Sequence, residues 1–134
     1  LDAIATDHAP HSILEKDVEF DQAANGITGL ESSLSLSLRL VREGHITANR
    51  LVELMSMNPA RLLGVEGGSL AEGMVADIIV IDPDIEYVFD EGAILSKGKN
   101  TPFIDWKLKG KAVLTFMGGR LTAGNIEEFL ESPA

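Results

Sequence analysis

The sequence predicts an α/β fold class followed by a small all-β unit, and three observations indicate this. Residues 1–6 are largely apolar, which is typical of a short buried strand. Residues 30–64 carry apolar side chains at helical spacing, together with capping signals. Beyond them the chain holds short apolar runs and a Gly-Gly pair, which favour strands and a hairpin. We therefore predict one unit over residues 1–65 and a second over residues 66–134.

A long loop is predicted over residues 8–28, directly after the first strand. These residues have mixed charge and no regular spacing of apolar side chains. They include His8, His11 and Gly26. Loops of this length inside compact domains are usually functional or disordered, so the loop is a candidate site.

Residues 30–43 fit both a strand and a helix. Leucines alternate with polar residues over 34–40, which is the period of a strand. Every fourth residue from Leu30 to Leu38 is also a leucine, which places these side chains on one helical face. The length of the segment favours a helix, and Gly44 suits its C-terminal cap. We predict a helix.

Two further helical segments are predicted before residue 65. Thr47 is suited to be the N-cap of the first segment. Asn58 is expected to cap the second, with Pro59 at its first helical position and Gly64 at its end. Residues 30–64 would thus form two or three packed helices.

Short strands are predicted in the second half of the chain. They cover residues 75–81, 86–89, 112–117 and 120–122. Gly118-Gly119 is a two-residue hairpin signal between the last two strands. Asp77 interrupts the first strand, and we expect it to pair with neighbouring backbone in a turn. Asn125 followed by Glu128 resembles a capping box and predicts a short terminal helix.

The composition argues against nucleic-acid and membrane partners. The 134 residues include 21 acidic and 11 basic side chains, a formal net charge of −10, whereas phosphate binding needs a basic surface. The sequence has no run of 18 apolar residues, so no membrane-spanning helix is expected. Cysteine is absent, which excludes disulfides and thiolate metal sites. We expect a cytoplasmic protein.

The densest group of chemically useful side chains is the string from Thr6 to His11. A carboxylate at the end of a strand, followed by two histidines in a loop, suits a metal or acid–base site. The spacing alone is a weak signal, since an Asp-His pair is also common in structural turns. At most one or two of Asp7, His8 and His11 are expected to contact the same ion.

A longer pattern makes this string more specific. Its main stretches are Ile4-Ala5-Thr6-Asp7-His8-Ala9-Pro10-His11, Asn25-Gly26-Ile27-Thr28-Gly29-Leu30-Glu31, Asn58-Pro59-Ala60-Arg61-Leu62-Leu63-Gly64, Ser96-Lys97 and Asn100-Thr101-Pro102-Phe103. Together they resemble the dihydroorotase family, and the resemblance covers about residues 1–122. Asp105 departs from the pattern, because the family commonly has Gly there.

The resemblance implies a fold, a metal and a reaction. Residues 1–65 would be the last βα portion of a (β/α)8 (TIM) barrel, and residues 66–134 the C-terminal part of a small β-sandwich. The barrel of this family carries a zinc centre. The implied reaction is reversible hydrolysis of the cyclic amide of (S)-dihydroorotate to N-carbamoyl-L-aspartate, in pyrimidine biosynthesis.

The resemblance also assigns roles to individual residues. Asp7 matches the family's last metal ligand, which is also its proton shuttle from the attacking hydroxide to the departing ring nitrogen. His11 matches the residue that grips the substrate carboxylate. Asn25 and Gly26 match loop positions whose backbone contacts the substrate. His8 has no such role, and we expect it to make a structural hydrogen bond that supports the loop.

The family's other metal ligands and a substrate-binding arginine would lie before Leu1. The chain also begins in an apolar stretch without Met, so we expect a fragment. Because a catalytic zinc site needs about three protein ligands, this fragment alone is expected to be inactive. Its expected partners are the small-molecule substrate, the missing N-terminal part of the barrel and further copies in a homo-oligomer.

Two alternatives stay open at this point. The parent could be another cyclic amidohydrolase, similar to an allantoinase or a hydantoinase. It could also be a non-catalytic dihydroorotase homologue that serves as a structural partner of another pyrimidine enzyme. The presence of Asp7 and His11 weighs against the second alternative.

Overall fold

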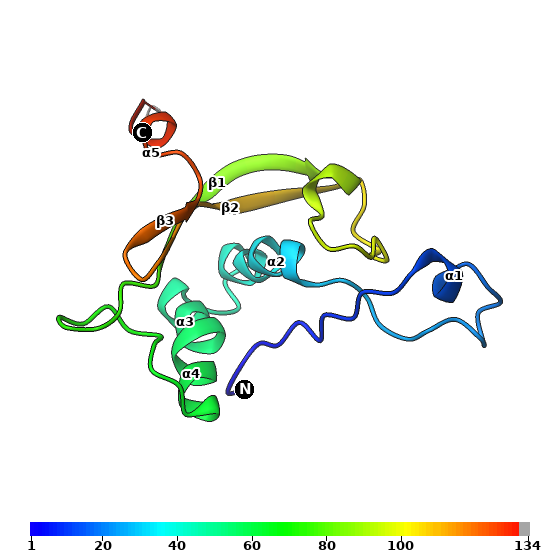
Figure 1. Ribbon diagram of the computed structural model, residues 1–134, viewed down its shortest axis with the longest axis horizontal. Helices are drawn as coiled ribbons and strands as arrows, with labels where there is room; N and C mark the ends of the chain where they lie inside the picture. Colours follow the sequence, from blue (N-terminus) through cyan, green and yellow to red (C-terminus); the bar gives the residue numbers. More distant parts are fainter. Residues whose placement is uncertain (132–134) are drawn as a thin grey trace.

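The computed structural model describes residues 1–131, and in it α2 lies along one face of a three-stranded antiparallel sheet (Figure 1). The strands are β1 (Ile78–Phe89), β2 (Trp106–Met117) and β3 (Arg120–Ala123), in the order β1-β2-β3. The helices are α1 (Ile13–Lys16), α2 (Leu30–Arg42), α3 (Ala48–Val52), α4 (Asn58–Leu63) and α5 (Ile126–Glu131). A π-helical segment, η1 (Glu53–Met57), joins α3 to α4, and a 3-10 turn, η2 (Glu91–Ala93), follows β1.

The ambiguous leucine-rich segment is a helix, as predicted. The side of α2 that faces the sheet carries small residues, so the helix approaches β2 closely. The Ser35 hydroxyl donates to the carbonyl of Gly110 at 2.6 Å and accepts from the Tyr87 hydroxyl at 2.7 Å. A Cβ at Gly110 would lie 2.4 Å from the Leu38 side chain, so only glycine allows this approach. Gly44, with a φ of 76°, follows the end of the helix.

The segment from α3 to α4 is one continuous helical stretch. Thr47 caps it as predicted, because its hydroxyl accepts from the backbone N–H of Arg50 at 3.1 Å. The prediction that Asn58 is an N-cap is wrong: its backbone is helical, and its amide donates to the carbonyl of Asp2. The wider π-helical turn precedes Pro59, whose ring clashes with the preceding turn in a regular α-helix. Gly64 ends the stretch at a φ of 66°, as predicted.

The sheet joins two of the predicted strands into one. Residues 75–81 and 86–89 are predicted to be separate strands, but β1 begins only at Ile78 and continues to Phe89, with register shifts on either side of Asp82. Pro83 lies in the second shift, where its lack of an N–H removes a ladder hydrogen bond. The hairpin between β2 and β3 is confirmed. Asp77 accepts from the Gly118 N–H at 2.7 Å, so its predicted pairing with backbone is confirmed, although the partner lies 41 residues away, in the β2–β3 turn.

The core lies between the sheet and the segment that connects β1 to β2. Phe89, Ile94 and Leu108 are almost fully buried and pack together. Phe103 packs against this cluster and meets Trp106 edge to face, with ring centroids 5.1 Å apart. Asp105 has a φ of 64°. The family that the sequence resembles commonly has Gly at this position, and glycine adopts such a backbone without strain.

The first strand predicted from the sequence is not formed. Residues 1–6 are extended but lie outside the sheet, and Leu1 is 85% exposed. A strand requires a hydrogen-bonded neighbour, and within residues 1–131 this segment has none. Its Ile4 N–H donates instead to the carbonyl of Leu54 in the helical stretch, at 2.9 Å.

The terminal helix is confirmed as α5, with the Asn125 side chain accepting from the N–H groups of Glu127 and Glu128. The α2 helix, at 13 residues, is the longest in the described part of the chain. None of the helices there has the length and apolar character needed to cross a membrane.

Candidate functional site

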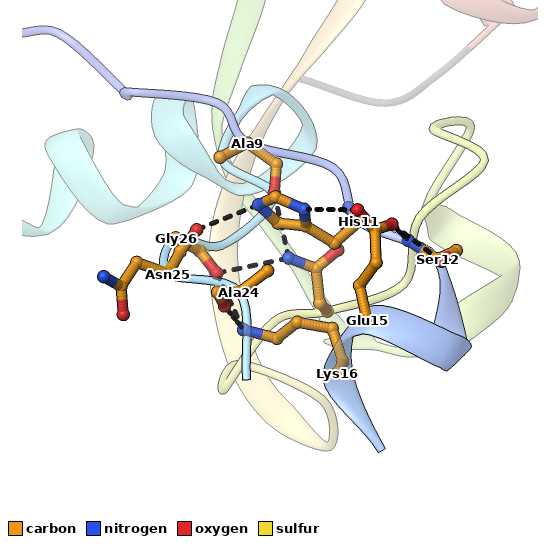
Figure 2. A network of polar contacts seen from close by, with 9 residues as sticks. Ala9, His11, Ser12, Glu15, Lys16, Ala24, Asn25 and Gly26 are labelled. Carbon is orange, nitrogen blue, oxygen red and sulfur yellow. Dashed lines mark hydrogen bonds and ion pairs between the residues drawn. The ribbon is translucent and has the colours of Figure 1, made fainter. Parts of the chain in front are cut away.

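The predicted long loop folds into a hydrogen-bonded network around His11, with α1 inserted in it (Figure 2). The His11 Nε2–H donates to the carbonyl of Asn25 at 2.9 Å. Its Nδ1 lies 3.7 Å from the Glu15 carboxylate. Hydrogen bonds from the Ser12 hydroxyl and N–H hold the pKa of Glu15 below its ordinary value, so a fixed anion faces the imidazole. The structure thus brings together His11 and Asn25, two of the residues that the motif resemblance singled out.

The carbonyl groups of residues 24–26 are all occupied by donors. The Lys16 ammonium donates to Ala24 at 2.7 Å and to Gly26 at 3.2 Å, while His11 takes the carbonyl of Asn25. Within residues 1–131, the backbone N–H groups of Asn25 and Gly26 have no acceptor. Two exposed backbone donors therefore remain for a ligand or for water.

Gly26 is required by the shape of this loop. Its φ is 104°, a conformation that side chains with a Cβ rarely adopt, and a Cβ there would lie 2.6 Å from the Cβ of Ala9. The segment around Ala9 and the segment before α2 are therefore in direct contact. The backbone N–H of Ala9 also donates to the carbonyl of Ile27 at 2.9 Å.

Asn100, from the second half of the chain, joins both loops. Its amide nitrogen donates to the carbonyls of Ala9 at 2.9 Å and Gly26 at 3.2 Å, and its amide oxygen accepts from the His11 N–H at 3.0 Å. The carbonyl of Asn100 accepts from the Thr28 N–H. Its role could not be predicted, because the partners of its side chain lie 74 to 91 residues away in the chain. The family-like Asn-Thr-Pro-Phe string was the one signal that marked it.

His8 makes the structural hydrogen bonds that were predicted for it. Its Nδ1 accepts from the N–H groups of Gly29 and Leu30, at 3.1 and 3.4 Å, where α2 begins. The ring proton therefore lies on Nε2, which faces the Ser96 hydroxyl at 3.4 Å. That hydroxyl donates to Glu31 at 2.6 Å.

Glu31 ends this chain of hydrogen bonds as a carboxylate. Partial burial raises the pKa of Glu31, but hydrogen bonds from the Ser96 hydroxyl and N–H outweigh that effect and hold the pKa below its ordinary value. An ionised carboxylate accepts both Ser96 donors, so it orients the hydroxyl towards itself and leaves the hydroxyl oxygen to accept from His8.

Asp7 is held differently from the other predicted site residues. Asp7 is exposed, and its backbone is left-handed, with a φ of 46°. Within the described residues its carboxylate has no hydrogen-bond or ion-pair partner, and no three histidine or acidic side chains converge as a metal site. A catalytic zinc ion needs about three protein ligands. The described residues therefore offer one carboxylate to such an ion and do not form a metal site by themselves.

Comparison with known proteins establishes the family. The profile of the amidohydrolase family matches residues 1–122. The chain belongs to the amidohydrolase family. Among the family's members, the dihydroorotase of Desulfotalea psychrophila is 60% identical over 119 residues, which is 89% of this chain and 28% of that protein. The dihydroorotase of Geobacter metallireducens is 55% identical over 121 residues, 90% of this chain and 28% of that protein.

A solved amidohydrolase shares the fold. The L-hydantoinase (dihydropyrimidinase) of Arthrobacter aurescens superposes with a TM-score of 0.85 at 34% identity, over 92% of this chain and 29% of that one. The resemblance to dihydroorotases inferred from the sequence motifs is thus confirmed. This amidohydrolase chain spans 28% of the length of the dihydroorotases that it matches.

Proposed function

We propose that this chain is part of a dihydroorotase, in which it supplies the substrate-binding loop and one acidic residue of the active site. The observation that carries the proposal is the convergence of His11, Asn25 and Gly26 in one network, in a chain 60% identical to a dihydroorotase. The complete protein that carries this chain would hydrolyse dihydroorotate to N-carbamoyl-aspartate in pyrimidine biosynthesis.

The substrate suits the donors that this loop presents. Dihydroorotate carries a carboxylate beside its ring, and the free N–H groups of Asn25 and Gly26 are donors without acceptors in the described chain. His11 would bind the same carboxylate by exchanging one of its present partners, Asn25 or Glu15. Charge-assisted hydrogen bonds of this kind are about twice as strong as neutral ones, so they would orient the ring.

Asp7 would act at the cyclic amide. Its carboxylate is exposed and without a partner in residues 1–131, so it is available both to an ion and to a proton. We assign it one metal ligand position and the transfer of a proton to the departing ring nitrogen. A zinc ion, when bound, polarises a carbonyl and acidifies water, and its remaining ligands would come from outside this chain.

The proposed architecture places residues 1–65 at the end of a (β/α)8 barrel and residues 66–134 in a small β-sandwich. Exposed apolar side chains support a covering partner: Leu62 is 69% exposed and Leu63 75%. The remaining part of the barrel would cover them, and copies of the complete protein would associate as a homo-oligomer. We place the enzyme in the cytoplasm, where pyrimidine synthesis supplies its substrate.

The experiment compares hydrolysis of three cyclic amides by the complete protein that carries this chain. We expect kcat/KM for dihydroorotate to exceed that for a plain hydantoin by at least about a hundredfold, because a substrate without the carboxylate leaves polar groups of the site unpaired. Allantoin is the third substrate. The likeness to an L-hydantoinase structure makes a hydantoinase the second candidate. A preference for hydantoin or allantoin would overturn the proposal.

A further inference from the structure

We infer that residues 96–100 form a positioning element of the active site, with Ser96 acting on Asp7 and Asn100 acting on the substrate-binding loop. This inference rests on the proposed function. The segment comes from the second half of the chain, between η2 and β2, yet both its ends are hydrogen-bonded to the loop after Thr6. Ser96 contacts His8, whereas Asn100 contacts Ala9, His11 and Gly26. Neither Ser96 nor Asn100 is expected to touch the substrate.

The first end of the segment fixes the residue next to Asp7. The chain of hydrogen bonds runs from His8 to the Ser96 hydroxyl and from there to the Glu31 carboxylate, at 3.4 and 2.6 Å. On its other side the imidazole accepts two N–H groups at the start of α2. The His8 side chain is thus held from both sides. Because His8 follows Asp7 directly, these contacts limit where the otherwise unsupported Asp7 backbone can lie.

The second end fixes the loop that carries the free N–H groups. Asn100 uses both atoms of its amide, donating to Ala9 and Gly26 and accepting from His11. Without this side chain the two loops would keep the Ala9–Ile27 and His11–Asn25 hydrogen bonds but lose three contacts, to Ala9, His11 and Gly26. The separation between the His11 ring and the N–H groups of Asn25 and Gly26 would then vary.

The middle of the segment explains why it can lie so close to the site. Gly98 is buried, and a Cβ there would lie 2.8 Å from the carbonyl oxygen of His11 and 2.9 Å from its nitrogen. Contacts under 3.0 Å cannot be kept, so a larger residue would push the segment off the loop. Residues 96–100 are therefore packed on the backbone of His11 as well as hydrogen-bonded to it.

The two ends predict different kinetic effects, because positioning groups act through the residue that they hold. Loss of the Ser96 hydroxyl should disturb Asp7, which is proposed to act in the chemical step, and should lower kcat. Loss of the Asn100 amide should disturb the groups that bind the carboxylate and should raise KM. A purely structural role would instead lower the active fraction, and kcat with it, in both variants at unchanged KM, together with a lower Tm.

The test measures kcat, KM, the Kd of N-carbamoyl-aspartate and Tm for variants of the complete protein. For Ser96→Ala we expect kcat to fall about tenfold with KM and Kd within about twofold, and Ser96→Thr to restore kcat. For Asn100→Ala we expect KM and Kd to rise about tenfold. Ser69→Ala and Asn49→Ala make the same chemical changes at exposed positions and are expected to match the wild type.

Milder substitutions serve if either variant does not fold. Ser96→Cys keeps a weak donor of similar size, and Asn100→Asp keeps the acceptor for the His11 N–H while losing both donated hydrogen bonds. The same division between kcat and KM is expected. Equal losses of kcat in both variants at unchanged KM, or values like those of the controls, would overturn the inference alone. A wild-type protein without dihydroorotate turnover would overturn the proposed function and this inference with it.

Discussion

His11 and Asp7 lie four positions apart in the sequence, yet the structure holds them in opposite ways. His11 is fixed by its backbone N–H and by its ring, which donates to Asn25, and the carbonyl of Gly26 accepts from Lys16 and Asn100. Asp7 is exposed, has a left-handed backbone and has no side-chain partner within residues 1–131. The comparison teaches that this chain by itself organises the loop around His11, whereas Asp7, in the role proposed for it, would need groups from outside this chain.

The largest effect is expected where the structure shows least support, at Asp7. Asp7→Asn in the complete protein should lower kcat about a thousandfold, because the amide cannot transfer a proton. Asparagine tolerates a left-handed backbone, so Tm should stay at the wild-type value. Kinetics and thermal unfolding measure both quantities. Asp17→Asn, at another exposed aspartate, is the control. A decrease in kcat of less than tenfold for Asp7→Asn would show that Asp7 does not act in the chemical step.

Gly26→Ala should weaken substrate binding by the loop around His11. The added Cβ would lie 2.6 Å from that of Ala9, so the two loops would separate and KM would rise about tenfold. The left-handed backbone adds a cost of about 1 to 3 kcal/mol in the free energy of unfolding. Gly73→Ala is the matched control, because Gly73 has a φ of 84° with no atom within 4 Å of the added Cβ. Equal KM values in the two variants would contradict the role of Gly26.

A smaller effect is expected from the cation that holds the carbonyls. Lys16→Met keeps the aliphatic part of the side chain but loses hydrogen bonds to Ala24 and Gly26. A hydrogen bond of this kind contributes about 1 kcal/mol, so we expect KM to rise about fivefold with kcat unchanged. Lys107→Met, at an exposed position on β2, should leave both parameters as they are. Steady-state kinetics would detect a fall in kcat instead, which would show that Lys16 acts on the chemical step.

The smallest effect concerns Glu31 and depends on pH. Since the pKa of Glu31 is lowered in the folded protein, its ionised form contributes stability above the unfolded-state pKa of about 4.3. That contribution is lost as the pH falls through the folded-state pKa. Glu31→Gln should therefore lower Tm at neutral pH, and the difference from the wild type should shrink below about pH 4. A difference that is constant over this range of pH would show that the charge does not matter.

Local signals predicted most of the helices and the hairpin, while long-range contacts set most of the site. The caps at Thr47 and Gly64 and the Gly118-Gly119 turn depend on neighbouring residues, and all were predicted correctly. The strand over residues 1–6 was not formed, because pairing depends on a neighbour and not on apolar character alone. The predicted cap at Asn58 also failed, since the π-helical turn lets the helix continue through Pro59.

The candidate site shows the same difference between local sequence signals and long-range contacts. The motif resemblance singled out His11, Asn25 and Gly26, which the structure brings together, and their substrate-binding roles stay predictions. It gave no role to Ser96 or Asn100, whose partners lie 65 to 91 residues away, because nothing in a linear pattern says which loop crosses which. The assignments of Asp7 as metal ligand and proton donor remain predictions, as do the boundaries of the two units at residue 65.

The most direct measurement of the contrast between the two regions is the Kd of N-carbamoyl-aspartate for Asp7→Asn and His11→Ala, determined by calorimetry on the complete protein. If the loop binds the carboxylate independently of Asp7, the first variant should bind the ligand within about threefold of the wild type, and the second should bind it about tenfold or more weakly. Equal weakening in the two variants would show that the loop and the acidic residue act as one unit, and would contradict this account.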